Sequence, residues 1–179
     1  LFAYKGSKII HMLRDPRDRY EASIAKHPNG KGKIGGATAR WLLTTRIAQH
    51  NLKKYPKQYK IVQYEQLVQD TANVLQGLCE FLDEEYSTDM LEMKGASEFR
   101  EKILRGAYGN KGPGLISTEF IGRYRQVIAK EELKFMQNLA GNSMKSFGYE
   151  LDEIRLSPAE SLKYRTRTFP DNLVRLTSW

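Results

Sequence analysis

The sequence has little of several things that define whole classes of protein. It contains one cysteine, Cys79, so no disulfide can form within the chain, and no Cys and His residues have the spacing of a zinc site. No stretch approaches the roughly 18 consecutive apolar residues of a membrane-spanning helix. No Ser, His and Asp set suggests a catalytic triad. These absences argue against a disulfide-bonded scaffold, a membrane span within these residues and a bound metal.

What is present suits a globular domain with an anionic partner. Hydrophobic residues make up 40% of the 179 residues and charged residues 28%, which is enough apolar material for a core. The 29 Lys and Arg exceed the 21 Asp and Glu by eight. Such an excess favours a phosphorylated small molecule, an anionic lipid or a nucleic acid. Because the basic residues are scattered and no aromatic residues interleave with them, nucleic acid is disfavoured as a partner.

The first part of the chain predicts a strand followed by a helix. Residues 8–13 are apolar and partly β-branched, and they lead into Arg14, Asp15 and Pro16. Asp15 suits the N-cap and Pro16 the first helical turn, so we expect a helix over residues 17–26. The glycine-rich stretch 27–36 is then expected to be a loop.

Further elements follow at spacings typical of an α/β protein. Apolar residues at helical spacing predict helices around residues 41–55, from about 71 to 82, and over 130–146, the last with Gly148 just past its end. Residues 59–63 predict a second strand, and residues 105–114 predict a mobile loop. The order favours an α/β fold with a parallel sheet flanked by helices. We expect residues 1–150 to form one domain and residues 151–179 a basic C-terminal tail.

An arginine at the carboxyl end of a strand, directly before a helix, is well placed to bind phosphate. The helix start offers unpaired N–H groups, and the guanidinium adds two parallel hydrogen bonds. Arg14 and Arg17 are the candidates. The alternative is structural, with Arg14 capping a carbonyl or pairing with Asp15 or Asp18.

Four sequence features in order carry a resemblance to a known family. They are Lys-Ile-Ile-His-Met-Leu-Arg-Asp-Pro-Arg-Asp from residue 8, Trp41, Tyr-Glu-Gln-Leu from residue 64, and Cys-Glu-Phe-Leu from residue 79. Over about residues 5–150 the chain resembles the sulfotransferase superfamily, whose members use 3′-phosphoadenosine-5′-phosphosulfate (PAPS) as sulfate donor. The resemblance implies a partial P-loop-like fold and transfer of a sulfuryl group to a hydroxyl or amine.

The resemblance also assigns binding residues. Arg14 would bind the 3′-phosphate together with a helical serine, for which Ser23 stands one residue later than the family's usual position, occupied here by Ala22. Tyr64 would lie near the adenine. Arg123, Tyr124 and Arg125 resemble part of a loop that covers the nucleotide, with Tyr124 in place of the family's common Trp.

No catalytic residue can be named. Nothing in residues 1–7 matches the family's phosphosulfate loop, and no base stands out, since His11 lies within the expected strand. We therefore expect the chain to be the C-terminal part of the enzyme and to be inactive alone. The acceptor and the oligomeric state cannot be read, and the compartment stays open, with the cytoplasm slightly favoured and an upstream signal or anchor left open. The alternative is a non-catalytic basic module that binds a nucleotide or another anion.

Overall fold

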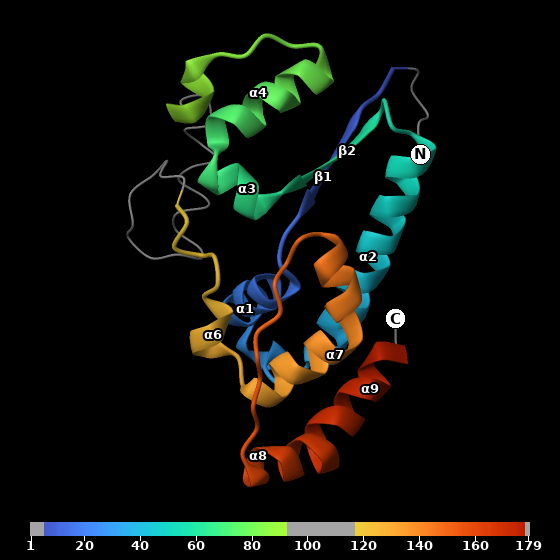
Figure 1. The fold of residues 1–179 in the computed structure, drawn as a ribbon, viewed down its shortest axis with the longest axis vertical. Helices are drawn as coiled ribbons and strands as arrows, with labels where there is room; N and C mark the ends of the chain where they lie inside the picture. The colour runs from blue at the N-terminus through green and yellow to red at the C-terminus, as the bar shows by residue number, and fades with distance from the viewer. Residues whose placement is uncertain (1–5, 93–116, 178–179) are drawn as a thin grey trace. The chain divides into compact units, whose positions relative to one another are not determined.

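The computed structural model describes residues 6–92 and 117–177 and divides the chain into two compact units. Unit 1 comprises Leu1–Leu13 and His50–Glu119, and unit 2 comprises Arg14–Gln49 and Phe120–Trp179. The mobile loop predicted over residues 105–114 lies outside the described residues. Figure 1 traces the order of helices and strands along the chain.

Unit 1 contains the sheet of the described part of the chain. Strands β1 (Ile9–Leu13) and β2 (Tyr59–Gln63) lie side by side and pair in parallel, with Leu13 opposite Gln63 (Figure 1). Both predicted strands are confirmed, as is the α/β class with its parallel sheet and flanking helices. After β2 come α3 (Tyr64–Gln69), α4 (Thr71–Leu82) and the 3-10 helix η2 (Thr88–Glu92). The buried residues of this unit include Tyr59, Val62, Leu78 and Cys79.

Unit 2 is helical in its described residues. It contains α1 (Pro16–Lys26), the 3-10 helix η1 (Pro28–Gly30), most of α2 (Ile34–Lys54), α6 (Tyr124–Val127) and α7 (Lys130–Ser146). Its core includes Trp41 of α2, which is 1% exposed and packs edge-on against Phe147 and Tyr149. The apolar face of α7, including Leu133, Met136 and Ala140, is buried as its spacing predicts.

Two helix ends are built as the local sequence predicts. At the start of α1, the Asp15 carboxylate accepts a hydrogen bond from the backbone N–H of Arg17, and Pro16 is the first helical residue. At the end of α7, Gly148 has φ +79°, and its N–H donates to Lys145 while that of Tyr149 donates to Met144. This is a Schellman motif, and glycine adopts its left-handed conformation without strain.

The expected loop over residues 27–36 is wrong in its last three residues, because α2 begins at Ile34. Gly35 is therefore helical. A Cβ at position 35 would lie 2.1 Å from the carbonyl oxygen of Asn172, so glycine is present here for close packing and not for a turn.

The basic C-terminal residues also form helices that their sequence pattern did not predict. These are α8 (Pro158–Lys163), the π-helical turn η3 (Tyr164–Thr168) and α9 (Phe169–Thr177). Asn172 of α9 is buried, and its Oδ1 accepts from the Gly35 N–H at 2.7 Å. The first N–H groups of a helix have no partner within it, so α9 satisfies one of those at the start of α2.

Candidate functional site

Arg14 follows β1 directly and is held from two directions within unit 2. Its carbonyl accepts a hydrogen bond from Trp41 Nε1 at 3.0 Å, and its Nη2 donates to the carbonyl of Phe120 at 2.9 Å. The side chain is half-buried. The structural alternative, in which Arg14 caps a carbonyl, is thus realised for one nitrogen of the guanidinium. The guanidinium has five N–H donors, and the contact of Arg14 with phosphate stays a prediction.

Arg17, the second arginine of the motif, is fully engaged inside the protein. Its Nε and Nη2 form a two-pronged contact with Asp15, its Nη1 lies 2.9 Å from both Gln137 and Asp152, and its Nη2 also donates to the carbonyl of Glu150. Burial alone lowers the pKa of Arg17, but these carboxylates outweigh it and the net pKa is raised. Arg17 is a structural residue, which leaves Arg14 as the phosphate-binding candidate of the motif.

Residues 122–125 are anchored to α1 by backbone hydrogen bonds. The buried carboxylate of Asp18 accepts from the N–H of Gly122 at 2.7 Å and from the N–H of Tyr124 at 3.2 Å. Burial raises the pKa of Asp18 more than these hydrogen bonds lower it. The result is a fixed position for the segment that was expected to cover a nucleotide.

The side chains of that segment also have internal partners. Tyr124 is 1% exposed, and its hydroxyl donates to Asp152 at 2.6 Å. The guanidinium carbons of Arg17 and Arg125 lie 4.4 and 4.8 Å from the centre of its ring. Burial and the carboxylate of Asp152 raise the pKa of Tyr124. Arg125 contacts Asp152 through Nε and Nη2, and Arg123 forms an ion pair with Glu21 at 3.3 Å. The geometry shows a structural cluster centred on Asp152, and the assignment of these three residues to the nucleotide stays a prediction.

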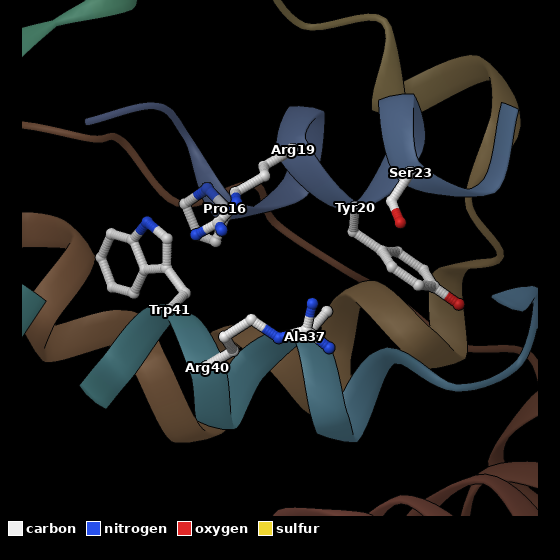
Figure 2. Close-up of a pocket in the computed structure, with 7 residues that line it drawn as sticks. All are labelled: Pro16, Arg19, Tyr20, Ser23, Ala37, Arg40 and Trp41. Atoms are coloured by element: carbon white, nitrogen blue, oxygen red, sulfur yellow. The ribbon is translucent and has the colours of Figure 1, made fainter. Parts of the chain in front are cut away.

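Ser23 lies in a small pocket between α1 and α2, with a cavity volume of about 50 Å³ (Figure 2). Its lining residues are Pro16, Arg19, Tyr20 and Ser23 of α1 with Ala37, Arg40 and Trp41 of α2. The structure therefore brings Ser23 together with Arg19 and Arg40. Arg14 does not line this pocket, although its carbonyl is bonded to Trp41 at the pocket wall.

Arg19 and Arg40 were not singled out by the sequence pattern. The sequence could have indicated Arg19, since Arg19 and Ser23 are four residues apart and so share one face of a helix. The contribution of Arg40 depends on how α2 packs against α1, which no local pattern in the sequence reveals.

Tyr64 belongs to unit 1. It is the first residue of α3, directly after the last residue of β2, and it is half-buried. Its expected position at the carboxyl end of a strand is confirmed, and its contact with adenine stays a prediction.

Among the described residues, no histidine or cluster of possible metal ligands forms a second candidate site. His11 lies on β1 as expected, with Nδ1 2.8 Å from the hydroxyl of Tyr59. In residues 6–92 and 117–177, no three His, Cys, Asp or Glu side chains gather as metal ligands would. The helices of the same ranges include none with the length and hydropathy to cross a bilayer.

Comparison with known proteins supports one family. No curated protein and no solved structure matches the chain. The model of the sulfotransferase family matches residues 1–88, which include Arg14, Ser23 and Tyr64 but not residues 123–125. This match agrees with the strand, arginine and helix arrangement of residues 9–26, and it supports membership of the chain in the sulfotransferase superfamily.

Proposed function

We propose that the chain is part of a sulfotransferase that takes its sulfuryl group from PAPS, with Arg14 as a ligand of the nucleotide's 3′-phosphate. The acceptor class is a hydroxyl or an amine. The observation that carries the proposal is the junction of β1 and α1: a parallel strand ends at Leu13, Arg14 follows, and Asp15 and Pro16 start the helix. Ligands of open α/β sheets bind outside the carboxyl ends of strands, where such a residue stands.

The side chains of this part of the chain suit a nucleotide that carries a 3′-phosphate. Arg17 forms ion pairs with Asp15 and Asp152, whereas Arg14 Nη2 donates a hydrogen bond to the neutral carbonyl of Phe120. A half-buried guanidinium with five N–H donors in a planar fork has the geometry that a phosphate ligand requires, which supports the proposal. Ser23, Tyr64 and the cluster of Arg123, Tyr124 and Arg125 are proposed to add further contacts to the phosphate and to the adenosine.

The proposal predicts a selective loss of affinity when Arg14 is replaced. Truncating one partner of a desolvated charge pair costs about 2–5 kcal/mol, so Arg14→Ala should weaken binding of 3′-phosphoadenosine-5′-phosphate by roughly thirtyfold or more. Adenosine 5′-phosphate lacks the 3′ group and should lose little. Arg155→Ala is the matched control, because Arg155 is exposed and forms a surface ion pair with Glu153.

Calorimetric titration of both nucleotides against the three proteins measures the effect. If folded Arg14→Ala binds both nucleotides as the wild type does, Arg14 is purely structural and the proposed donor site is wrong. A wild-type protein that binds adenosine 5′-phosphate as tightly as the 3′-phosphorylated nucleotide would equally contradict it.

A further inference from the structure

A second cavity of unit 2 lies where the loop before α2, the start of α7 and the C-terminal helices meet. Its volume of about 390 Å³ falls in the range of sites that bind small molecules. None of the residues proposed to bind the nucleotide lines it. The cavity is therefore a separate candidate site.

Acidic residues at the start of α7 tie the walls of this cavity together. Glu131 forms an ion pair with Lys163 of α8 at 2.7 Å. Glu132 accepts a hydrogen bond from the hydroxyl of Tyr20 at 2.7 Å, and the same hydroxyl accepts from the backbone N–H of Lys33 at 3.1 Å. Both carboxylates are buried and have partners within the protein, so they hold the surrounding segments in place.

Basic side chains outnumber acidic ones around the cavity. Three lining residues are acidic, the two glutamates of α7 and Asp171, and five are basic, namely Lys31, Lys33, Lys163, Arg167 and Arg175. The exposed side chains of Lys33 and Arg167 form no ion pair or hydrogen bond with any residue that the structure describes. An excess of two positive charges around one cavity attracts an anion.

The helical segment formed by α8, η3 and α9 supplies four of these charged residues from one face (Figure 1). Lys163, Arg167, Asp171 and Arg175 recur at a spacing of four, which aligns side chains along a helix. Thr168 lines the same cavity and is 8% exposed, and its hydroxyl forms no hydrogen bond with the described residues. Buried hydroxyls normally have a partner, and a ligand in the cavity would provide one. Arg167 and Thr168 lie in the π-helical turn, a feature frequent at functional sites.

We infer that this cavity binds a small hydrophilic anion with at least two negative groups, a polycarboxylate or a polyphosphate. Guanidinium and ammonium groups donate charge-assisted hydrogen bonds to the oxygens of both. Two negative charges match the excess of positive charge around the cavity. The lining residues that the structure describes include no aromatic ring on which a base could stack, which disfavours a nucleotide. The inference is independent of the proposed donor site.

Matched substitutions test the site with citrate and pyrophosphate as probes, and with acetate as the singly charged comparison. Lys33→Gln and Arg167→Gln each remove one cation from the cavity. Arg165→Gln is the control, since Arg165 is exposed in the same π-helical turn and does not line the cavity. Calorimetric titration of each protein is run at constant ionic strength, so that screening by salt is the same in every sample.

The wild type should bind citrate or pyrophosphate more tightly than acetate, and the probe that it prefers identifies the negative groups as carboxylates or phosphates. Each cavity variant should bind that probe about three- to tenfold more weakly, because a contact to an exposed cation is lost. Arg165→Gln should bind it as the wild type does. Without a ligand, Arg167→Gln should melt close to the wild-type temperature, since its side chain has no ion pair among the described residues.

Four outcomes overturn the inference. They are no binding of either probe to the wild type, acetate binding as tight as that of the preferred probe, unchanged affinity in either cavity variant, and an equal loss of affinity in Arg165→Gln. Arg14→Ala separates this site from the donor site, because it should bind citrate and pyrophosphate as the wild type does. If Arg14→Ala alone lost the probe, the anion would lie at the donor site and the inference would be wrong, while the proposed function would stand.

Discussion

Asp18 accepts a hydrogen bond from the backbone N–H of Gly122 at 2.7 Å, across 104 residues of sequence. The other carboxylate oxygen accepts from the N–H of Tyr124. Asp18 is buried in α1, so this contact fixes the position of the segment that carries Arg123 and Arg125. An acidic residue of the arginine-containing motif thus serves to anchor a distant part of unit 2.

Replacing Asp18 should remove the hydrogen bonds that hold Gly122 and Tyr124 against α1 and so lower the stability of the protein. Asp18→Ala leaves two N–H groups without their acceptor, and an unsatisfied buried donor costs about 1–3 kcal/mol. We expect a loss of unfolding free energy in that range, measured by urea denaturation. Asp18→Asn keeps one acceptor oxygen and should lose less. A denaturation midpoint unchanged in Asp18→Ala would show that the contact contributes no net stability.

Asp152 should make the stability of the protein depend on acid pH. Burial alone raises the pKa of Asp152, but hydrogen bonds from Tyr124 and Arg125 and the charges of Arg17 and Arg125 outweigh it, so the pKa is lowered. A carboxyl whose pKa is lower in the folded state stabilises the protein above its unfolded pKa of about 3.9. That contribution is lost as the pH falls from about 5 through the folded pKa.

The matching measurement is the melting temperature of the wild type and Asp152→Asn between pH 7 and pH 3. The wild type should be the more stable protein at pH 7, and the difference should shrink as the pH falls below about 4. Circular dichroism at each pH confirms that both start folded. A difference that stays constant over this range would mean that Asp152 does not act through its charge.

The elements predicted correctly are those whose causes are local. The run of apolar residues before Arg14 predicts β1, Asp15 and Pro16 mark the start of α1, and Gly148 ends α7. In each case the residues that determine the conformation lie within a few positions of it. The resemblance to sulfotransferases came from the same local motifs, and the family match covers most of them.

What could not be predicted depends on contacts between distant residues. Gly35 looked like a loop residue, but its lack of a side chain serves a contact with Asn172, 137 residues away. The acidic partners of Arg17 and Arg125 include Asp152, at the start of a stretch whose sequence suggested only a basic tail. Arg40 reaches the Ser23 pocket only because α2 packs beside α1. Sequence patterns reveal the faces of helices but not which faces meet.

The contact between Gly35 and Asn172 predicts a strong effect of one methyl group. In Gly35→Ala the new Cβ would meet three backbone atoms of Asn172 within 3 Å, so a helix must shift. Overpacking of this kind costs about 1–3 kcal/mol or more, beyond the gain of under about 1 kcal/mol from replacing a helical glycine. Thermal unfolding should show a clear loss of stability.

Gly77→Ala provides the matched control for this loss. Gly77 also lies inside a helix, α4, and the nearest atom to its added Cβ is the flexible Lys60 Nζ at 3.5 Å. This variant should be as stable as the wild type or more stable by up to about 1 kcal/mol. If both alanine variants had the same stability, the close approach of α9 to α2 would be wrong.

The net charge of +8 should not make the protein a tight binder of DNA or heparin. Several cations are neutralised internally, including Arg17 by Asp15, Arg125 by Asp152 and Lys163 by Glu131. The remaining charge is scattered, whereas polyanion binding requires many basic residues along one path, each of which releases counterions. At physiological salt we expect only nonspecific affinity, with dissociation constants weaker than about 10 μM.

Fluorescence anisotropy of a labelled DNA duplex, repeated over a range of salt concentrations and with heparin as competitor, measures this affinity. Excess 3′-phosphoadenosine-5′-phosphate serves as the control, because a nucleotide site that also accounted for the DNA signal would release the duplex. Tight binding that tolerates any sequence and falls steeply with salt would instead indicate an extended basic surface. That result would favour a polyanion-binding module over a protein whose positive charge serves one small phosphorylated donor.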